Sequence, residues 1–528
     1  MKKREYLNRE YLNIGLNNRF VIIIIALTLQ LLAFIGVILR FYKYFAFFYA
    51  GSIIVSLLAV LFILNNRSNP VYKIAWIIPI LIFPIFGGLF YIFFGVNRLS
   101  KRKKHSMRFI SEKTQDTIHP RPEIVAEIES LNNNAGNQSR YIQNYSYYPP
   151  YRNTYCEYLP SGEQTFAKLK EELQKARHYI FLEYFIIEEG IMWNSILEIL
   201  IAKVKEGVEV RVIYDDLGCL VKLPYNYSHK LEELGIKCAV FNPVIPVLSP
   251  HHNNRDHRKI AIIDGQTAFT GGVNLADEYI NAKEKYGHWK DSAIMLKGEA
   301  AWSLTVMFLT MWGYLKGIDE DYKQFKIPPG QFKEKEKDVL KGGDSKLGFV
   351  QPFADSPLDN EPVGETIYFN LINKAQKYVY ITTPYLIINN EIITALTTAA
   401  KSGVDVRIIT PYIPDKWYVH AVTRSYYKIL LEEGIRIYEY TPGFIHSKTF
   451  VADHEYGVVG TINMDYRSLF LHFECGVWLY GCGVIKDMYN DFINTLEKCQ
   501  EITLQDLQRI HWYKKLLGFI LRIFAPLM

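Results

Sequence analysis

Two stretches of the chain carry the same polar residues at the same spacing. The first reads HRKIAIIDGQTAFTGGVN from His257 to Asn274, and the second reads HSKTFVADHEYGVVGTIN from His446 to Asn463. A histidine, a lysine, an aspartate, a glycine and an asparagine recur in one register. A single His-x-Lys would mean little, but a set of five that is held twice at fixed offsets indicates a pair of chemical motifs.

These residue types suit the transfer of a phosphodiester group. A neutral histidine can attack phosphorus, and a protonated histidine can give its proton to the leaving oxygen. We therefore expect His257 and His446 to form and break a covalent phosphohistidine, with Lys259 and Lys448 neutralising the phosphate oxygens. The amides expected to donate hydrogen bonds to the charge of the transition state are those of Asn274 and Asn463.

The same arrangement predicts neither a metal ion nor a cofactor. Ammonium groups repel a divalent cation, and no carboxylate shares the face of the histidines. Each histidine nevertheless needs a carboxylate that fixes its tautomer. Asp291 in HWKDSAIML and Glu474 in HFECGVWLY occupy corresponding places after the two motifs, each at the start of an apolar strand. We expect these two carboxylates to orient the histidines.

Each motif reads as a β-hairpin. Asp264-Gly265 is a strong turn signal, and with Gly265 and Gln266 as turn residues His257 lies across from Asn274. The second copy then turns at His454 and Glu455. The aspartates of the motifs are counted with the catalytic residues, although strand alternation places them on the other face as turn or support residues; they are Asp264 and Asp453.

The repeat extends well beyond the motifs. KARHYIFLEYF from Lys175 is echoed by KAQKYVYITTPY from Lys374, and KEGVEVRVI from Lys205 by KSGVDVRII from Lys401. Helical and strand patterns alternate in both copies, which indicates an α/β class. We expect two pseudo-symmetric halves with mixed sheets flanked by helices, at 156–325 and 345–500, whose symmetry could bring the hairpins to one central site. The polar stretch 101–155 reads as a linker.

Residues 1–100 read as a hydrophobic transmembrane region with apolar runs at 20–39, 44–64 and 74–95. Basic residues flank both ends, so the positive-inside rule indicates that one run does not cross. The third run contains Pro79, Pro84, Gly87 and Gly88 and is expected to be re-entrant or interfacial. The C-terminal segment 501–528 is amphipathic, and either an interfacial helix or a helix packed on the domain fits it.

The composition indicates which binding partners and which cellular redox compartment suit the protein. A net charge of +6 on 528 residues suits an anionic membrane surface better than a nucleic-acid groove. The six cysteines form no C-x-x-C pair and read as packing residues in a reducing compartment.

At its motifs the chain resembles the phospholipase D superfamily, whose HxKxxxxDxxxxxxGSxN pattern matches both copies except at the serine position, occupied by Gly272 and Thr461. Within that superfamily it is most similar to bacterial cardiolipin synthases, through RDHRK, IDGQTAFTGGVNLADEY, the WKD that follows, the TPY of Thr383 to Tyr385, and SNPVYKIAWIIPILIFPIFGGLFYIFFG. The additional apolar run at 20–39 departs from that family.

The resemblance implies that two phosphatidylglycerol molecules give cardiolipin and glycerol, with His257 as nucleophile and His446 as general acid and base. We expect a multi-pass protein of the bacterial plasma membrane with the catalytic domain on the cytoplasmic side. The near-symmetric sequence alone does not choose the nucleophile. Three alternatives stay open: a hydrolase or phosphatidyltransferase with a different acceptor, a nuclease of the superfamily, and a membrane scaffold with an inactive site.

Overall fold

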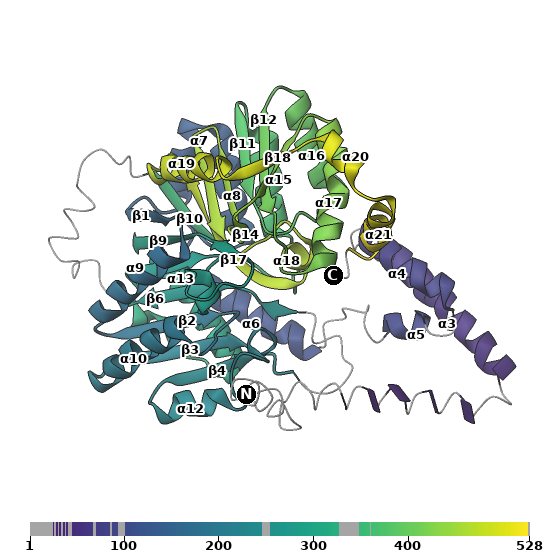
Figure 1. Ribbon diagram of the computed structural model, residues 1–528. Helices are drawn as coiled ribbons and strands as arrows, with labels where there is room; N and C mark the ends of the chain where they lie inside the picture. The colour runs from purple at the N-terminus through teal and green to yellow at the C-terminus, as the bar shows by residue number, and fades with distance from the viewer. Residues whose placement is uncertain are drawn as a thin grey trace, which may run out of the picture. The chain divides into compact units, whose positions relative to one another are not determined.

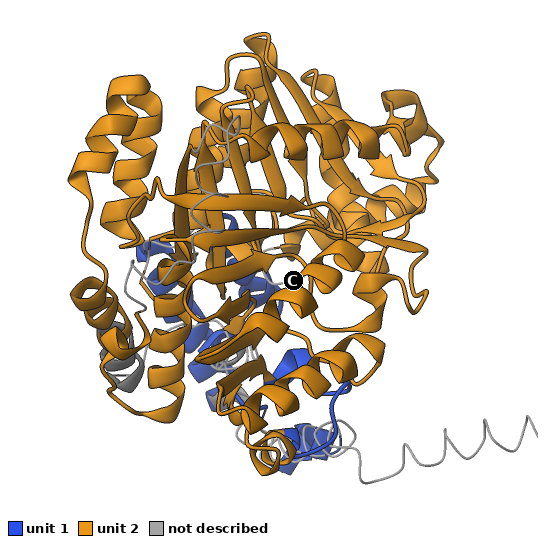
Figure 2. Ribbon diagram, turned by 90° about the vertical axis from the view of Figure 1, so that its left-hand side faces the viewer, with its two compact units in different colours: residues 1–98, 216–227, 242–253 blue, residues 99–215, 228–241, 254–528 orange. Residues whose placement is uncertain are grey.

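The computed structural model describes residues 45–66, 70–84, 87–92, 101–244, 254–326, 348–359 and 361–525, together with single positions between 25 and 40. The chain divides into two compact units (Figure 2). One comprises residues 1–98, 216–227 and 242–253, and the other comprises 99–215, 228–241 and 254–528. Both copies of the repeated motif belong to the second unit, which is therefore the part of the chain that positions the site.

The first half of the second unit is built on a mixed sheet in the order β1-β9-β7-β6-β2-β3-β4 (Figure 1). Strands β2, β3 and β4 are parallel, and the strands on the other side of β2 are antiparallel. The strands are β1 Thr154–Leu159, β2 Tyr179–Tyr184, β3 Glu209–Asp215, β4 Lys237–Phe241, β6 Lys259–Ile263, β7 Thr267–Gly271 and β9 Ala293–Gly298. The helices and 3-10 turns of this half are α9 Gly162–Lys175, α10 Ile191–Lys205, α12 Tyr227–Glu233, α13 Ala301–Lys316, η4 Asp277–Ile280 and η5 Tyr322–Phe325.

The second half repeats this order, with an additional strand at its edge. Its sheet runs β10-β17-β16-β15-β11-β12-β13-β18, so each strand of the first sheet has a counterpart in the same position. The strands are β10 Phe349–Asp355, β11 Tyr378–Thr382, β12 Asp405–Pro411, β13 Arg436–Tyr440, β15 Thr449–Ala452, β16 Tyr456–Gly460, β17 His472–Tyr480 and β18 Cys499–Ile502. The helices are α15 Val363–Lys374, α16 Asn390–Lys401, α17 Trp417–Glu432, α18 Tyr466–Phe470, α19 Val484–Leu496, α20 Leu504–Arg509 and α21 Trp512–Ile523. The predicted repeat of a mixed α/β unit is confirmed.

One hydrophobic core joins the two halves. It includes Phe181 and Ile262 from the first sheet, Val477 from the second, and Phe308 on α13. Helix α13 is buried on all sides along most of its length, which explains its nearly continuous apolar sequence. The two halves therefore fold as a single body around a shared interior.

Two short parallel ladders also cross between the halves. Strand β5 (Arg255–Asp256) of the first half pairs with the start of β17, and β14 (Gly443–Ile445) of the second half pairs with β8 (His288–Lys290). Each of β5 and β14 ends immediately before a motif histidine. The ladders are therefore equivalent under the pseudo-twofold symmetry, and each fixes one histidine against the opposite half.

The predicted hairpins are present, but their predicted register is wrong by one residue. Ile263 pairs with Thr267, and in the second copy Ala452 pairs with Tyr456, so each turn has three residues rather than two. The aspartate itself takes the first turn position in the left-handed region, with φ 52° at Asp264 and 56° at Asp453. Aspartate tolerates this conformation, which the two-residue interpretation did not consider. The predicted pairing of His257 with Asn274 fails for the same reason.

Residues 101–155 are not a linker. They form α6 (Lys101–Thr117), α7 (Pro122–Leu131), α8 (Asn133–Tyr145) and the first residues of β1. The Asn132 side chain caps α8 by accepting from the amides of Asn134 and Ala135. Gln351 of β10 donates to the carbonyl of Ser139 at 3.0 Å. The many polar residues of this stretch therefore cap and anchor helices, which a reading from composition does not distinguish from a loose segment.

The N-terminal region is only partly described. More than half of the run at 20–39 lies outside the described residues, and the other two runs form α3 (Phe45–Asn65), α4 (Pro70–Ile82) and α5 (Gly87–Phe90). The third run is interrupted between α4 and α5, and Ser56 Oγ donates to the Pro84 carbonyl at 2.7 Å. Within the described part of the chain, no helix has the combination of length and apolar sequence needed to cross a bilayer.

Candidate active site

Each motif histidine is hydrogen bonded to a carboxylate of the opposite half. His257 Nδ1 lies 2.9 Å from Glu474 Oε1 and 3.0 Å from Oε2, and His446 Nδ1 lies 2.7 Å from Asp291 Oδ2. All four side chains are buried. A carboxylate accepts hydrogen bonds, so in each neutral ring Nδ1 carries the proton and Nε2 keeps its lone pair. The predicted contacts of Asp291 and Glu474 with the histidines are present, and the exchange between halves is an addition that the sequence did not reveal.

The crossing ladders explain this exchange. The amide of His257 donates to the carbonyl of Phe473 at 2.9 Å, and the amide of His446 donates to that of Lys290 at 2.7 Å. Each histidine thus lies directly beside the residue that precedes its carboxylate partner on the opposite half. Backbone hydrogen bonds, rather than side-chain packing alone, set the distance between imidazole and carboxylate.

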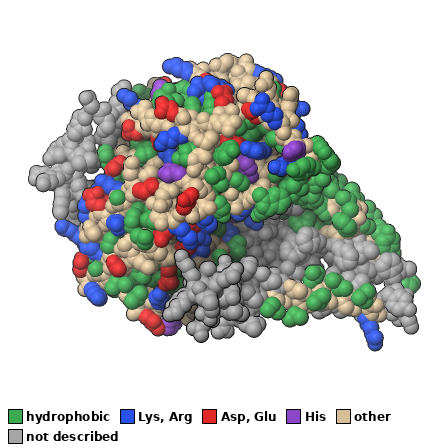
Figure 3. Space-filling model, viewed as in Figure 1, with side chains coloured by type: hydrophobic (Ala, Val, Ile, Leu, Met, Phe, Trp, Pro, Cys, Tyr) green, Lys and Arg blue, Asp and Glu red, His purple; other side chains and the backbone are tan. Residues whose placement is uncertain are grey.

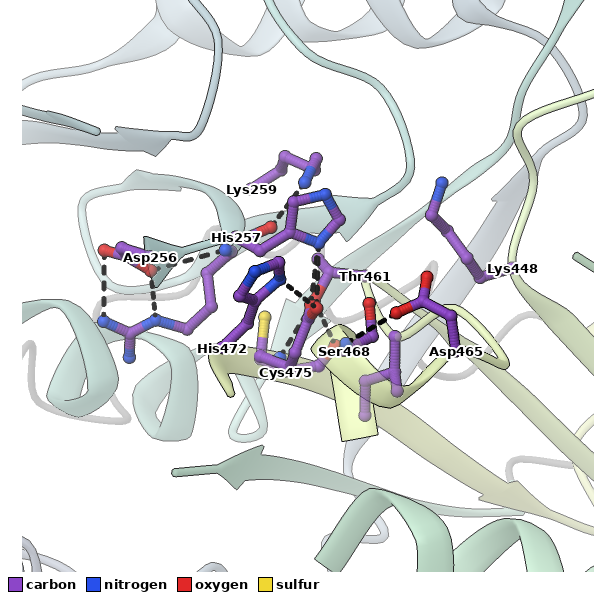
Figure 4. Close-up of polar contacts among 12 residues, drawn as sticks. Asp256, His257, Lys259, Lys448, Thr461, Asp465, Ser468, His472 and Cys475 are labelled. Atoms are coloured by element: carbon purple, nitrogen blue, oxygen red, sulfur yellow. Dashed lines mark hydrogen bonds and ion pairs between the residues drawn. The ribbon is translucent and has the colours of Figure 1, made fainter. Parts of the chain in front are cut away.

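The two sites differ at the motif position where the superfamily pattern has serine. Thr461 Oγ1 donates a hydrogen bond to Glu474 Oε2, and this bond fixes the longer glutamate side chain (Figure 4). At the corresponding Gly272, a Cβ atom would lie 1.9 Å from Asp291 Oδ1. The carboxylate of Asp291 therefore occupies the space of a side chain at position 272. Glycine at position 272 leaves room for Asp291, and threonine at position 461 provides a hydrogen-bond donor for Glu474.

Both lysines lie beside their histidines in buried surroundings. Lys259 Nζ donates to the carbonyl of His257, and Lys448 Nζ to that of His446. Burial lowers the pKa of Lys259 to about 8 and that of Lys448 to about 7. Figure 4 shows Lys259 and Lys448 on either side of the His257 ring. An anion bound between them would restore their positive charge, because it stabilises the protonated form.

The histidines are held neutral. Burial, followed by the charges of Lys259 and Lys448, keeps the pKa of His257 well below its usual value. Burial also lowers the pKa of His446 to about 4, although Asp291 acts in the opposite direction. In the free protein near neutral pH each Nε2 is therefore an available lone pair, and a histidine that acts as an acid must first gain a proton.

The motif asparagines are tied into the site walls. The Asn274 amide donates to the Tyr279 hydroxyl at 2.7 Å and accepts from the amide of Ile186 at 3.0 Å. The side-chain oxygen of Asn463 is buried and has no hydrogen-bond partner among the described residues. The geometry thus offers Asn463 as a group that is still available to a ligand.

The motif aspartates lie away from the histidines. Asp264 accepts hydrogen bonds of 2.7 to 2.9 Å from the amides of Arg177, His178 and Tyr179. Asp453 accepts the equivalent three bonds from residues 376, 377 and 378. These bonds occupy both oxygens of each aspartate in joining the hairpin to β2 or β11, so the structure places Asp264 and Asp453 on the supporting side of the hairpin and not beside the histidines.

Aromatic rings enclose both imidazoles. Phe185 lies 5.1 Å from His257 between ring centroids, while Trp289, Tyr279 and Phe444 lie 5.5, 5.6 and 5.8 Å from His446. Such walls exclude water and strengthen the electrostatic interactions inside the site. The sequence does not single out these residues, since aromatic residues are common throughout the chain and only proximity to the histidines distinguishes them.

A further histidine stands close to the first site. The ligand atoms of His257, His472 and Glu474 all lie within 4.8 Å of one another, a donor set that zinc accepts. Glu474 is already hydrogen bonded to His257, however, and the charge of Lys259 opposes a cation. The described geometry therefore favours hydrogen bonding over metal ligation. His472 was not among the predicted site residues, although it stands only two residues before Glu474.

Comparison with known proteins agrees with this arrangement. Residues 169–312 and 368–496 match the family described as cardiolipin synthase, PLD-like domain, and residues 54–95 match the family described as phospholipase D-nuclease N-terminal. An uncharacterized protein of Streptococcus mutans is 43% identical over 89% of this chain and 99% of its own length. A cardiolipin synthase of Halalkalibacterium halodurans is 34% identical over 90% of this chain and 93% of its own length.

A solved structure supports the fold alone. The crystal structure of phosphatidylserine synthase from Haemophilus influenzae matches 74% of this chain and 97% of its own, with a TM-score of 0.54 and 16% sequence identity. The family match covers both motif-bearing halves, and the match to cardiolipin synthases covers nearly the whole chain. The chain therefore belongs to the cardiolipin synthase family of the phospholipase D superfamily.

Proposed function

We propose that this protein transfers the phosphatidyl group of one phosphatidylglycerol to the terminal hydroxyl of another, giving cardiolipin and glycerol. The observation that carries the proposal is the pair of buried imidazoles, each with a carboxylate on Nδ1 and a lysine two residues away. Family membership supports the lipid substrate and makes a nuclease a poor fit.

In the first step, Nε2 of neutral His257 attacks the phosphorus of the first lipid. A P–N bond forms, and the P–O bond to the headgroup glycerol breaks as His446 gives a proton to the departing oxygen. His446 must be protonated for this step. We expect the negative charge of the bound phosphodiester, together with Asp291, to raise the pKa of His446 above its value in the free protein.

In the second step, His446 takes the proton from the terminal hydroxyl of a second phosphatidylglycerol. That oxygen attacks the phosphatidyl-His257 intermediate, a P–O bond forms, and the P–N bond breaks. His257 returns to its neutral form. One phosphodiester is exchanged for another, so the reaction needs no nucleotide or external energy source.

The other site residues act on charge and position. Lys259 and Lys448 balance the phosphate charge. The side-chain oxygen of Asn463, unpaired among the described residues, can only accept a hydrogen bond, so it suits a hydroxyl of the lipid headgroup. Glu474 and Asp291 fix the tautomers and stabilise the positive charge that develops on each ring. Within this proposal the support aspartates have no chemical step.

The N-terminal region would hold the enzyme at its substrate. The match of residues 54–95 to the family's N-terminal segment, and the apolar composition of that segment, support a membrane-associated enzyme. We extend this to a multi-pass anchor in a bacterial plasma membrane with the catalytic unit on the cytoplasmic side. The basic residues that flank the apolar runs support this orientation.

The test is purified full-length protein in phosphatidylglycerol vesicles, with the products separated by thin-layer chromatography. We expect cardiolipin and glycerol in equal amounts. Phosphatidic acid without cardiolipin would replace the synthase proposal with hydrolysis. His257→Ala should abolish the covalent lipid adduct, and His446→Ala should slow its formation and its release. An undiminished adduct in the first variant would overturn the choice of nucleophile.

A further inference from the structure

Helix α21 presents an apolar surface outward from the catalytic unit. Six of its large hydrophobic residues are exposed, Leu521 and Ile523 are half-buried, and Gly518 is the buried residue of the helix. Trp512 is 74% exposed and Phe519 66%, values otherwise typical of charged side chains. The space-filling view shows hydrophobic side chains gathered over this helix (Figure 3). The residues of this outer face are Trp512, Tyr513, Leu516, Leu517, Phe519 and Ile520.

The opposite side of α21 is fixed on α17. A Cβ atom at Gly518 would lie 3.0 Å from the carbonyl oxygen of Ala421, so the two helices approach closely only because this residue is glycine. The guanidinium of Arg522 lies over the Tyr426 ring, 4.1 Å from its centroid. The outer face of α21 is thus held in a defined orientation and is not simply the apolar side of a frayed end.

The charges around the outer face favour an anionic partner. The segment from His511 to Met528 contains no aspartate or glutamate, and Lys514 and Lys515 lie exposed in its first turn. Tryptophan and tyrosine at the start of an apolar helix, beside lysines that can extend toward phosphate groups, are typical of helices that lie in the headgroup region of a bilayer. A soluble protein partner with the same area would need an acidic and apolar surface together.

Helix α17 also connects α21 to the active site. The first turn of α17 presents Trp417, which is 64% exposed, next to Lys416. The Lys416 ammonium lies 5.8 Å from the Tyr385 ring centroid, Tyr385 lies 6.4 Å from Phe444, and Phe444 lies 5.8 Å from His446. A short chain of contacts therefore runs from the helix that holds α21 to a reacting histidine.

We propose that the outer face of α21 inserts into the headgroup region of an anionic bilayer and, through α17, holds the active site close to that surface. This surface acts in addition to the N-terminal region. The insertion itself depends only on the exposed residues and the lysines, whereas its role in delivering substrate rests on the proposed function.

The test places an environment-sensitive fluorophore on the full-length protein in vesicles. Phe519→Cys is labelled in a background of Cys156→Ser and Cys499→Ser, since the other cysteines are buried. The matched control is Leu131→Cys on α7, where the native side chain is 65% exposed against 66% for Phe519. Lipids with a doxyl group near the headgroup should quench the probe at position 519 and leave the probe at position 131 unaffected.

Lipid, protein and water around the probe at position 519 give different fluorescence results. A probe at 519 that is shielded from water but not quenched by doxyl lipid would show that protein covers the face, either a second copy or another part of the chain, and would overturn the proposal. A probe that is fully exposed to water would overturn it as well. Both readouts are independent of turnover, so they stand even if the proposed reaction fails.

The lysines provide a second measurement. Lys514→Gln with Lys515→Gln should reduce the preference of α21 for phosphatidylglycerol over phosphatidylcholine vesicles by about fivefold per lysine, measured as the lipid fraction that half-saturates quenching. Neither lysine belongs to the active site, so the groups around His257 and His446 remain unchanged in these variants. Quenching that is equal in neutral and anionic vesicles would refute the charge part of the proposal.

Discussion

Each motif histidine contacts a carboxylate of the opposite half, and this arrangement predicts that Glu474→Gln and Asp291→Asn affect the reaction differently. Both keep the shape of the side chain and remove one negative charge. In the proposed mechanism Glu474 supports the nucleophile His257, and Asp291 supports His446, which moves the proton. Each variant should therefore slow a different event.

For Glu474→Gln the tautomer of His257 survives. The amide nitrogen can turn toward the hydroxyl of Thr461, which is able to accept, and the amide oxygen keeps the bond from Nδ1. The loss is then that of a charged hydrogen-bond partner, worth about 1.5 to 3 kcal/mol. At 1.36 kcal/mol per factor of ten, formation of the adduct should slow by about 10- to 150-fold.

For Asp291→Asn the tautomer of His446 is at risk. Asp291 Oδ1 accepts from the amide of Ser292 at 2.8 Å, and Oδ2 accepts from His446. Asparagine has one acceptor for these two donors. If the oxygen stays with Ser292, its amide nitrogen faces Nδ1 and moves the ring proton to Nε2, where it blocks the proton uptake of the second step. We expect a larger loss of turnover than in Glu474→Gln.

The assay measures the phosphatidyl-enzyme adduct in a single turnover, with phosphatidylglycerol and with a phosphatidyl ester of nitrophenol. Nitrophenolate leaves without a proton, so the ester bypasses the general acid. We expect the ester to restore adduct formation in Asp291→Asn and not in Glu474→Gln. Thermal unfolding of both variants serves as the control for folding.

The opposite pattern, with the ester rescuing Glu474→Gln alone, would refute the assignment of roles and make His446 the nucleophile. Equal losses that no substrate relieves would show that both carboxylates act only on the stability of the site.

Three other predictions follow from the same geometry. Because the pKa of Lys448 is lowered to about 7 and the phosphate needs its charged form, kcat/KM should fall as pH rises through about 7 to 8, while kcat, measured with phosphate bound, falls at higher pH. Gly272→Ser should lower turnover at least tenfold, since its Cβ would lie 1.9 Å from Asp291 Oδ1 and must displace the partner of His446; single-turnover kinetics would detect this. Gly518→Leu should force α21 away from Ala421, so that proteolysis within 510–525 becomes faster while activity on detergent-dispersed lipid is retained.

The sequence supported the parts of the site that depend on residue type and repetition. The duplicated motifs identified both histidines, both lysines and the α/β halves, because strand and helix patterns recur with them. Asp291 and Glu474 were found from their equivalent places after the motifs. The sequence did not show that each carboxylate contacts the histidine of the opposite half. This pairing depends on β5 and β14, strands of two and three residues that leave no periodic pattern.

Other features depended on local geometry that a pattern does not encode. A one-residue error in the turn changed the pairing of every residue in the hairpin, because Asp264 adopts a left-handed conformation more often reserved for glycine. The helices between 101 and 145 were missed because polar side chains within the stretch, such as Asn132 at the start of α8, satisfy backbone groups. Composition counts such residues as solvent-exposed.

The crossed ladders also bear on how the enzyme is made. During synthesis His257 emerges well before its carboxylate partner Glu474, which lies near the end of the second half. A nascent or truncated chain therefore has a histidine without the group that fixes its tautomer. Each half by itself lacks the carboxylate that contacts its own motif histidine, so under the proposed mechanism we expect activity only from the complete pair of halves.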